Sequence, residues 1–364
     1  MQKTFKLSVF VIIILFPAIS FGQYNNSSFD DMFFYRLPSA RAEAMGRAYA
    51  SIDGDISTVF FNPAGTASIK GLELNASFAS PYYMAPWVKI NYFGLAYHFN
   101  KYLTIGLSRN QVNYGTMLLR TTENPEGTGV SGIVAHSIYT LNIASQPIKD
   151  LFVGVNTNYM VYNVISENPK TLFFDFGVIK KLPLKQNRNF QQSINIAANI
   201  CNLNNSKMTY KNADKAAEIT EYSYDLPVIT RYAANYQLIY KNHLLNDTLN
   251  IMEFLAQAEY NDLLNSDYMT SYHFGTELKL LEILSLRVGY YHKKIDDFGN
   301  PSYQKDNISS FTYGFGFQLP LYKLIKFPLN INFDYTSQPE QTNSKITSDS
   351  GDYNSYTFRL NWRF

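Results

Sequence analysis

The sequence predicts an all-β protein, a transmembrane antiparallel β-barrel of about fourteen strands with an N-terminal helical plug in its lumen. The first observation is a long series of segments after residue 70 in which apolar residues alternate with polar or small ones. The second is composition: 16% of the 364 residues are charged, against about 25% in ordinary soluble domains. The third is that the connections between these segments alternate between short and long, as the turns and loops of outer-membrane barrels do.

Composition also excludes several classes of protein. The 31 Lys and Arg against 29 Asp and Glu give a net charge of +2, so no basic excess indicates a nucleic-acid partner. A mean hydropathy of −0.19 is too low for a bundle of membrane helices. The single cysteine, Cys201, excludes a disulfide framework within the chain. What remains is a β-rich chain, with 29 Tyr and 27 Phe, whose surface needs few charges.

Residues 1–22 are expected to form a cleaved signal peptide. Lys3 and Lys6 precede an apolar run over residues 7–16, and Ser20 and Gly22 are small residues before a cleavage site. An uncleaved membrane anchor is the alternative, but it needs about 20 apolar residues. No cysteine follows the signal, which argues against lipoprotein processing.

Residues 23–70 do not show the barrel pattern and are expected to form a periplasmic hatch, or plug. Ser39–Ser51 is predicted to be a short Ala-rich helix. Turns are expected at residues 53–55 and 62–65, on either side of an apolar run. A barrel of about fourteen strands encloses more space than its own side chains fill, so a plug of small residues is physically reasonable.

Residues 71–364 are expected to form the barrel. The alternation is clearest in 310–319, where Phe315 and Phe317 should face lipid while Gly314 and Gly316 face the lumen. A soluble sandwich would alternate too, but strands of about ten residues with aromatic ends favour a membrane barrel. The expected strands are 72–79, 87–99, 102–113, 134–146, 150–164, 171–182, 190–203, 226–240, 247–261, 269–281, 283–293, 308–320, 327–337 and 353–364.

Two details of this pattern make further predictions. The apolar parity switches at Tyr92-Phe93, and a β-bulge would explain the switch. The longer polar stretches 114–133, 204–225, 294–307 and 338–352 are expected to be loops on one side of the membrane, with both chain ends on the other.

Charged residues at inward positions form either a solvated lumen wall or a polar path. Arg41 of the hatch is expected to pair with one of the inward acids. The inward charges are Glu73, Asp175, Arg231, Glu259, Glu277, Lys279, Arg287, Arg359 and Arg363.

The chain ends in an amphipathic strand with a terminal aromatic. Such an end is typical of barrels that the outer-membrane insertion machinery recognises, with chance as the alternative. The residues of this expected assembly signal are Phe358, Leu360, Trp362 and Phe364.

The hatch residues resemble a family signature. The stretch Ala-Arg-Ala-Glu-Ala-Met-Gly-Arg-Ala-Tyr (40–49), two aspartates and Phe-Asn-Pro-Ala-Gly (61–65) resemble the hatch of FadL-like outer-membrane barrels, especially their PorV/PorQ relatives in Bacteroidetes. Arg47 departs from the pattern, because relatives often have glycine there. The matching positions are Arg41, Met45, Gly46, Asp53, Asp55, Asn62, Pro63, Ala64 and Gly65.

The resemblance implies an outer-membrane barrel with one of two functions. The barrel either serves type IX secretion as a carrier or docking barrel for secreted proteins, or moves hydrophobic small molecules through the hatch and a side opening. The implied partners are outer-membrane lipid, the barrel insertion machinery, secreted proteins or secretion-system components, and hydrophobic small molecules. A structural or adhesive surface barrel is a further alternative.

No catalytic or metal-binding motif stands out. The five histidines lack metal-ligand spacing, and neither a nucleophile elbow nor a phosphate-binding loop is present. Asp53 and Asp55 could bind calcium, but a turn around Gly54 is the simpler interpretation, because calcium takes six or more oxygens. We therefore expect no enzyme activity, no metal and no cofactor.

Overall fold

The computed structural model describes residues 39–80, 87–165, 168–212, 220–241, 250–264, 269–295, 308–339 and 352–363. The predicted signal peptide, the start of the predicted hatch and Phe364 lie outside these ranges. Among the helices that the structure describes, none has the length and apolar character to cross a membrane.

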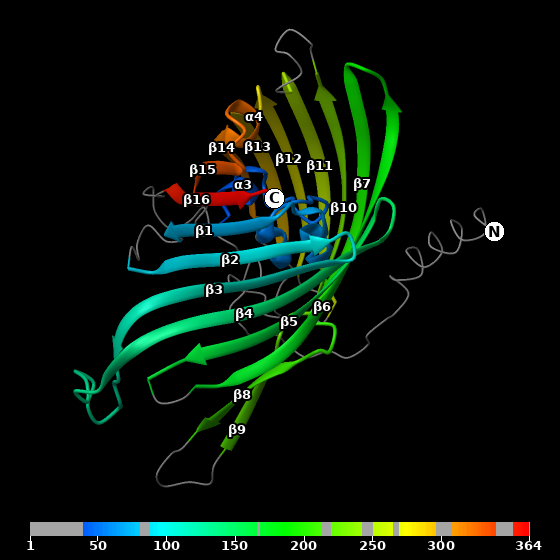
Figure 1. The fold of residues 1–364 in the computed structure, drawn as a ribbon. Helices are drawn as coiled ribbons and strands as arrows, with labels where there is room; N and C mark the ends of the chain where they lie inside the picture. The colour runs from blue at the N-terminus through cyan, green and yellow to red at the C-terminus, as the bar shows by residue number, and fades with distance from the viewer. Residues whose placement is uncertain are drawn as a thin grey trace, which may run out of the picture.

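The fold is a closed antiparallel barrel of fourteen strands in the described residues, closed by pairing of β1 with β16 (Figure 1). All fourteen predicted strands are present. Their bounds are β1 (Leu72–Ser80), β2 (Lys89–Asn100), β3 (Leu103–Leu118), β4 (Ser131–Ile148), β5 (Leu151–Asn163), β6 (Lys170–Gln186), β7 (Phe190–Cys201), β10 (Ile229–Tyr240), β11 (Met252–Leu263), β12 (Met269–Leu280), β13 (Leu284–Ile295), β14 (Ile308–Pro320), β15 (Leu329–Pro339) and β16 (Asp352–Trp362).

The predicted faces are confirmed. On β14, Phe315 and Phe317 are 43% and 45% exposed on the outer wall, whereas Thr312 is fully buried on the inner side. The outer stripe is continued across the neighbouring strand by ring contacts such as Phe315 with Tyr335, whose centroids are 5.4 Å apart. An apolar exterior of this kind is what a lipid-facing barrel wall requires.

The expected β-bulge at Tyr92-Phe93 is wrong. The register of β2 with both β1 and β3 is continuous there, and the shift in β2 lies at His98 and Asn100 instead. The parity changes because Tyr92 is an inward-facing aromatic, fully buried with its hydroxyl donating to the carbonyl of Ile56 at 2.9 Å. An apolar contact with the hatch, rather than an extra residue, therefore breaks the sequence pattern.

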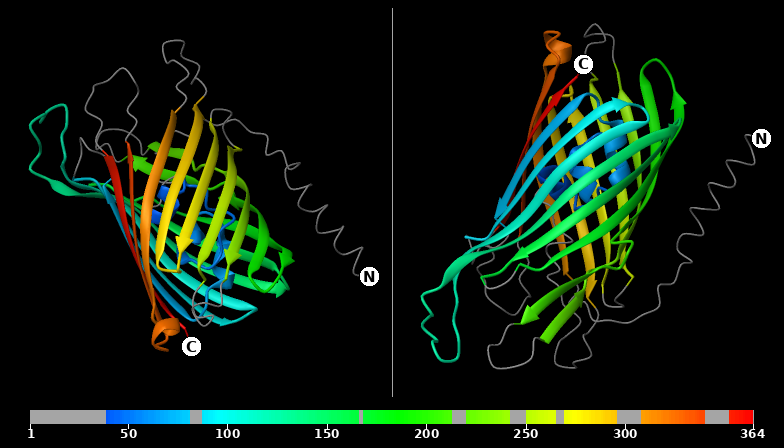
Figure 2. Two further views of the ribbon diagram at one scale, coloured as in Figure 1. Left: turned by 90° about the horizontal axis from the view of Figure 1, so that it is seen from above. Right: turned by 60° about the horizontal axis from the view of Figure 1, so that its bottom comes forward.

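The two ends of the barrel differ. One end, here called the short-turn end, carries the chain's last strand end and the turn helix α4 (Leu321–Leu324). The other, the long-loop end, carries the hairpin of β3 and β4, which projects well beyond the barrel (Figure 2). Since β3 ends at Leu118 and β4 begins at Ser131, the loop expected over 114–133 is partly strand.

The loop expected over 204–225 is also wrong in part, because it contains the hairpin of β8 (Lys207–Asn212) and β9 (Thr220–Asp225). Met208 of β8 is fully buried and belongs to an apolar cluster at the long-loop end of the lumen. This cluster holds Ala79, Val88, Ile90, Val112, Ile138, Met160, Phe173, Cys201, Met208, Leu226, Ile229, Leu263 and Tyr353.

Inside the barrel, residues 39–70 form the hatch (Figures 1 and 2). It contains α3 (Ala40–Ala44) and the short 3₁₀ helices η2 (Ile56–Phe60) and η3 (Pro63–Ser68). The helix predicted over 39–51 is shorter than expected, because Gly46 and Arg47 adopt positive φ angles of 64° and end it. Met45, Ala64 and neighbouring apolar residues of the hatch are fully buried against the wall.

Candidate functional site: the hatch and the hollows around it

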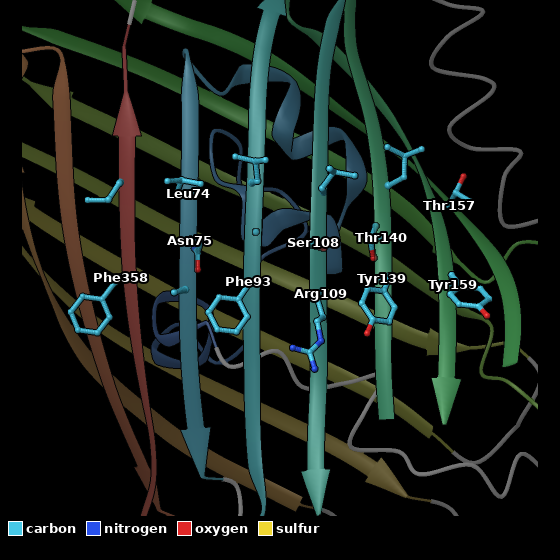
Figure 3. A pocket seen from close by; sticks show the side chains of 16 residues that line it. Leu74, Asn75, Phe93, Ser108, Arg109, Tyr139, Thr140, Thr157, Tyr159 and Phe358 are labelled. Atoms are coloured by element: carbon cyan, nitrogen blue, oxygen red, sulfur yellow. The ribbon is translucent and has the colours of Figure 1, made fainter. Parts of the chain in front are cut away.

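Three hollows surround the hatch. A charged vestibule of about 630 Å³ lies at the short-turn end, and a cavity of about 30 Å³ lies between Phe60 of the hatch and Ile138 of the wall. The third hollow, of about 820 Å³, is a groove on the outside of the wall, with the hatch behind the strands that line it (Figure 3). The inner cavity has room for little more than one or two waters. Between the hatch and this part of the wall, the described residues therefore leave little room for a solute.

A chain of ion pairs fastens the hatch to the wall. Arg41 donates from Nε to Oε2 of Glu277 at 2.9 Å and from Nη2 to Oε1 at 2.8 Å. Arg287 donates to the same carboxylate at 2.5 Å and to Asp334 at 2.7 Å. Glu277 is thus shared between two arginines and Arg287 between two carboxylates, which offsets the cost of burying these charges. The inward acid that pairs with Arg41 is therefore Glu277, on β12.

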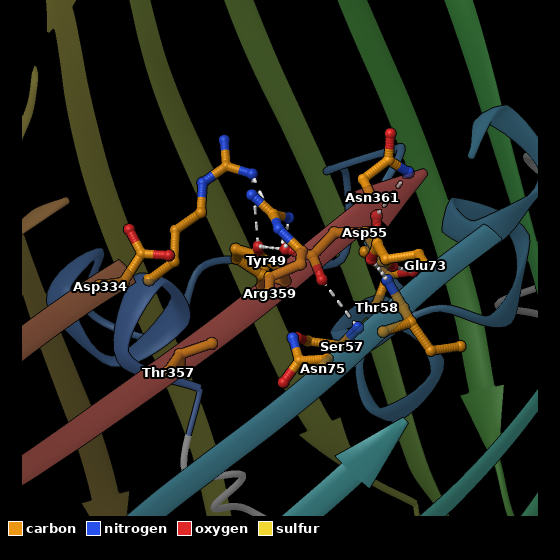
Figure 4. A network of polar contacts seen from close by, with 12 residues as sticks. Tyr49, Asp55, Ser57, Thr58, Glu73, Asn75, Asp334, Thr357, Arg359 and Asn361 are labelled. Carbon is orange, nitrogen blue, oxygen red and sulfur yellow. Dashed lines mark hydrogen bonds and ion pairs between the residues drawn. The ribbon is translucent and has the colours of Figure 1, made fainter. Parts of the chain in front are cut away.

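Asp55 is a second anchor, and it joins the hatch to β16 (Figure 4). Its Oδ1 accepts from the backbone N–H of Ser57 at 2.8 Å and so caps η2. Its Oδ2 accepts from the hydroxyl of Tyr49 at 2.7 Å and from Arg359 at 2.5 Å. Burial raises the pKa of Asp55, but Arg359 and Arg41 outweigh it, so its pKa lies below the ordinary value.

Two further acids on the wall bind hatch backbone. Oε2 of Glu259 accepts from the N–H groups of Tyr49 and Ala50 at 2.7 and 2.8 Å. Oε1 of Glu73 accepts from the N–H of Ile56, the first residue of η2, at 2.7 Å. Such bonds satisfy donors that would otherwise be buried without a partner.

The Asn-Pro-Ala-Gly turn packs directly on the wall. Asn62 caps η3 by accepting from the N–H of Ala64 at 3.0 Å, and it donates to the carbonyl of Ala50 at 2.9 Å. Pro63 occupies the first position of η3, where a missing N–H costs nothing. On the facing strand β5, a Cβ at Gly154 would lie 2.3 Å from the backbone of Pro63. Glycine in the wall therefore makes this close approach possible.

A wall glycine also allows close packing at Met45 and Gly46, on the other side of the lumen. A Cβ at Gly289 would lie 2.0 Å from the backbone nitrogen of Gly46, so β13 also approaches the hatch at a glycine. Arg47, the residue at which the sequence departs from the hatch resemblance, pairs with Glu43 at 3.1 Å and lies over the ring of Tyr291. Its side chain is thus accommodated without separating hatch and wall.

Asp53 lies at the rim of the vestibule and accepts from Asn195 at 3.3 Å. It does not join Asp55 in a common site. Within the described ranges, no group of three or more His, Cys, Asp or Glu is placed to hold a metal ion. The turn interpretation of residues 53–55 agrees with Gly54, whose φ is 81°.

The remaining predicted residues are distributed over the molecule. Gly65 lies against Thr58 within the hatch, and Phe358 and Leu360 face outward on β16 with 51% and 41% exposure. Trp362 packs edge-on against Phe327, with ring centroids 5.3 Å apart. Sequence reasoning missed Asp334 and the close contacts between the hatch and glycines of β5, β6, β12 and β13. A signal for the glycine contacts was available, since these glycines occupy inward positions of the alternation.

Comparisons with known proteins give solved structures only. No family model matches the chain, and no curated protein matches it. Solved structures similar to it include the Pseudomonas putida toluene transporter TodX, with 11% identity, 88% of this chain and 96% of that chain covered, and a TM-score of 0.43. The CymD monoaromatic hydrocarbon channel matches at 10% identity, 89% and 97% coverage and a TM-score of 0.47. A Pseudomonas aeruginosa FadL homologue matches at 11% identity, 88% and 96% coverage and a TM-score of 0.44. At these values the matches carry no conclusion about the ligands or partners of this chain.

Proposed function

We propose that this chain is an outer-membrane passage for hydrophobic small molecules, held closed by its hatch. The observation that supports the proposal is the apolar inner wall on the long-loop side of the hatch. Val112, Ile138 and Met160 face inward there and are buried, whereas the lumen of a water-filled barrel is polar. An apolar lining favours an apolar solute over ions or sugars.

The position of this lining relative to the hatch gives the route. Ile138 and Phe173 border the small cavity opposite Val59 and Phe60 of η2, and polar side chains complete its lining. Phe60 is only partly buried, so η2 borders the free space on the long-loop side of the hatch. Passage then requires a local shift of η2 that breaks its hydrogen bonds to Glu73 and Tyr92, while the ion pairs of α3 stay in place.

A nearly isosteric change tests the route. Val112→Thr adds a hydroxyl to the inner lining, and Val155→Thr makes the same change on the outer face of β5, where Val155 is 45% exposed. In cells that depend on this barrel for toluene uptake, uptake should fall for the inner variant and stay unchanged for the outer one. Heat-modifiability on gels should show that both variants fold equally well. Equal uptake by both variants would mean that the apolar lining is not part of the route.

A second function, as a carrier or docking barrel in type IX secretion, is favoured by a different observation. The projecting β3–β4 hairpin exposes Met117, Leu118, Val130 and Ile133, at 41 to 59% of each side chain. Exposed apolar side chains gathered beyond the membrane are typical of a protein-binding surface. Replacing these four residues by serine should then stop release of a secreted cargo in a host with that machinery and leave toluene uptake intact. Normal release would contradict this second function.

We further propose that the chain is exported, loses residues 1–22 and is inserted through its C-terminal signal, with residues 23–70 as hatch and 71–364 as barrel. The long-loop end then faces the cell exterior. In a Cys201→Ala background, an impermeant thiol reagent on intact cells should label Glu126→Cys and leave Lys326→Cys unlabelled, because these exposed positions lie at opposite ends. The reverse labelling would invert the proposed orientation.

A further inference from the structure

Arg109 is a charged residue on the outer, largely apolar wall of the barrel. Arg109 lies on β3 opposite Phe93 of β2 and Tyr139 of β4. Before it, the outward positions of β3 are Ile105 and Leu107; after it, they are polar, Gln111 and Asn113. Arg109 therefore stands where the outer face of β3 changes from apolar to polar, which is where an amphiphile's headgroup meets its chain.

The groove in which Arg109 lies has the form of an amphiphile site. It crosses six neighbouring strands, from β16 to β5, and its volume of about 820 Å³ is within the range of roughly 300–1,000 Å³ usual for small-molecule pockets. Figure 3 shows Arg109 between Phe93 and Tyr139, with further aromatic rings along the same row. The apolar side chains that line it include Leu74, Phe93, Leu95, Leu107, Leu141 and Phe358.

The charge of Arg109 has no counterpart in the groove. No acidic residue is among the residues that line it, and the Nε of Arg109 is buried without a hydrogen-bond partner among the described residues. In the lumen, by contrast, Arg41 and Arg287 each pair with carboxylates. An arginine on a lipid-facing wall is costly unless an anion or water meets it, so such a residue marks a functional site.

We propose that this groove binds an anionic lipid of the surrounding leaflet. Its acyl chain lies along Leu107 and Leu141, and its phosphate accepts charge-assisted hydrogen bonds from Arg109. The aromatic rings on either side suit the interfacial depth of a headgroup. The proposal goes beyond the passage function, since the groove lies outside the barrel and needs no movement of the hatch.

Native mass spectrometry of the folded protein in a non-ionic detergent tests the proposal. Phosphatidylglycerol and phosphatidylcholine with identical chains are added in equal amounts. The wild type should retain phosphatidylglycerol in preference, and Arg109→Gln should reduce that preference about tenfold or more. Arg120→Gln, an exposed arginine further along the same hairpin, should leave it unchanged.

A second variant keeps the test independent of charge. Ala76 faces outward and lines the groove, so Ala76→Phe should fill it and weaken retention of both lipids. Equal retention of the two lipids by the wild type, or equal losses in Arg109→Gln and Arg120→Gln, would overturn the proposal. In a competition experiment, bound oleate that phosphatidylglycerol does not displace would also overturn the proposal. The site would then bind a free fatty acid carboxylate rather than a membrane lipid.

Discussion

Arg41 of the hatch and Glu277 of β12 are 236 positions apart in the chain and form a two-bond ion pair inside the barrel. The side chain of Glu277 is 5% exposed and is shared with Arg287, so the pair is one link of a continuous chain from the hatch to β15. Its position defines what the hatch can do. It fixes the α3 end of the hatch to the wall through charges, whereas η2 is held by hydrogen bonds to Glu73 and Tyr92.

Arg41→Gln should loosen the α3 end of the hatch. Removing one member of a buried ion pair costs about 3–5 kcal/mol, because the remaining charge loses its partner; the continued contact of Glu277 with Arg287 should keep the cost at the lower end. Limited proteolysis should cut residues 40–50 faster in this variant. Arg120→Gln, at an exposed position, is the control. Equal cleavage rates in the two variants would mean that the pair does not hold the hatch.

Acid should release the Asp55 anchor. The pKa of Asp55 is lowered in the folded protein, so its contribution to stability is present above the unfolded value of about 4 and is lost as the pH falls through the folded pKa. The conductance of the wild type should therefore stay low from pH 7 to about 4 and rise only below it. Asp55→Asn cannot ionise and should already raise the conductance at pH 7, whereas Asp53→Asn, at the half-exposed vestibule rim, should not. A wild-type conductance of Asp55→Asn at pH 7 would contradict the role of this carboxylate.

Gly154→Ala should push the Asn-Pro-Ala-Gly turn away from the wall. The added Cβ would lie 2.3 Å from backbone atoms of Pro63, which cannot swing aside as a side chain can. Overpacking of this kind costs about 1–3 kcal/mol. Gly132→Ala is the matched control, since its Cβ would meet Ile165 at an ordinary 3.5 Å. A thermal midpoint that drops for Gly154→Ala alone is expected; equal midpoints would show that the turn is free to move.

Phe315→Arg should destabilise the barrel in lipid. Phe315 is in the middle of the outward stripe of β14, where an arginine costs about 2–4 kcal/mol if it lies near the membrane midplane. Gln318→Arg points into the vestibule and should cost far less. Urea unfolding in vesicles measures the difference. Similar losses for the two variants would mean that the stripe does not face lipid.

Much of the barrel could be predicted because a strand's alternation is a local property. Phe315 and Gly316 reveal their faces by their immediate neighbours, and the same holds for most of the barrel. Tyr92 could not be assigned in this way, since its contact with Ile56 joins two parts of the chain that only the closed barrel brings together.

The residues of the candidate site could be predicted from the sequence, but their ion-pair partners could not. The hatch motif and the inward charges were visible, but the partner of Arg41 depends on the register of β12 against the hatch, which no local pattern encodes. The end of α3 was missed for a similar reason. Alanine-rich sequence favours a longer helix, and the close contact of Gly46 with β13 requires the positive φ that ends it.

The most direct test of the account is the single-channel conductance of a barrel that lacks residues 30–66, measured beside the intact protein. Strand pairing and the outer stripe do not involve these residues, so the deleted protein should insert and resist heat denaturation as a barrel. The lumen would then be open, and we expect a large, steady conductance where the intact protein is closed. A folded deletion variant that stays closed would contradict the account, because something other than the hatch would fill the lumen.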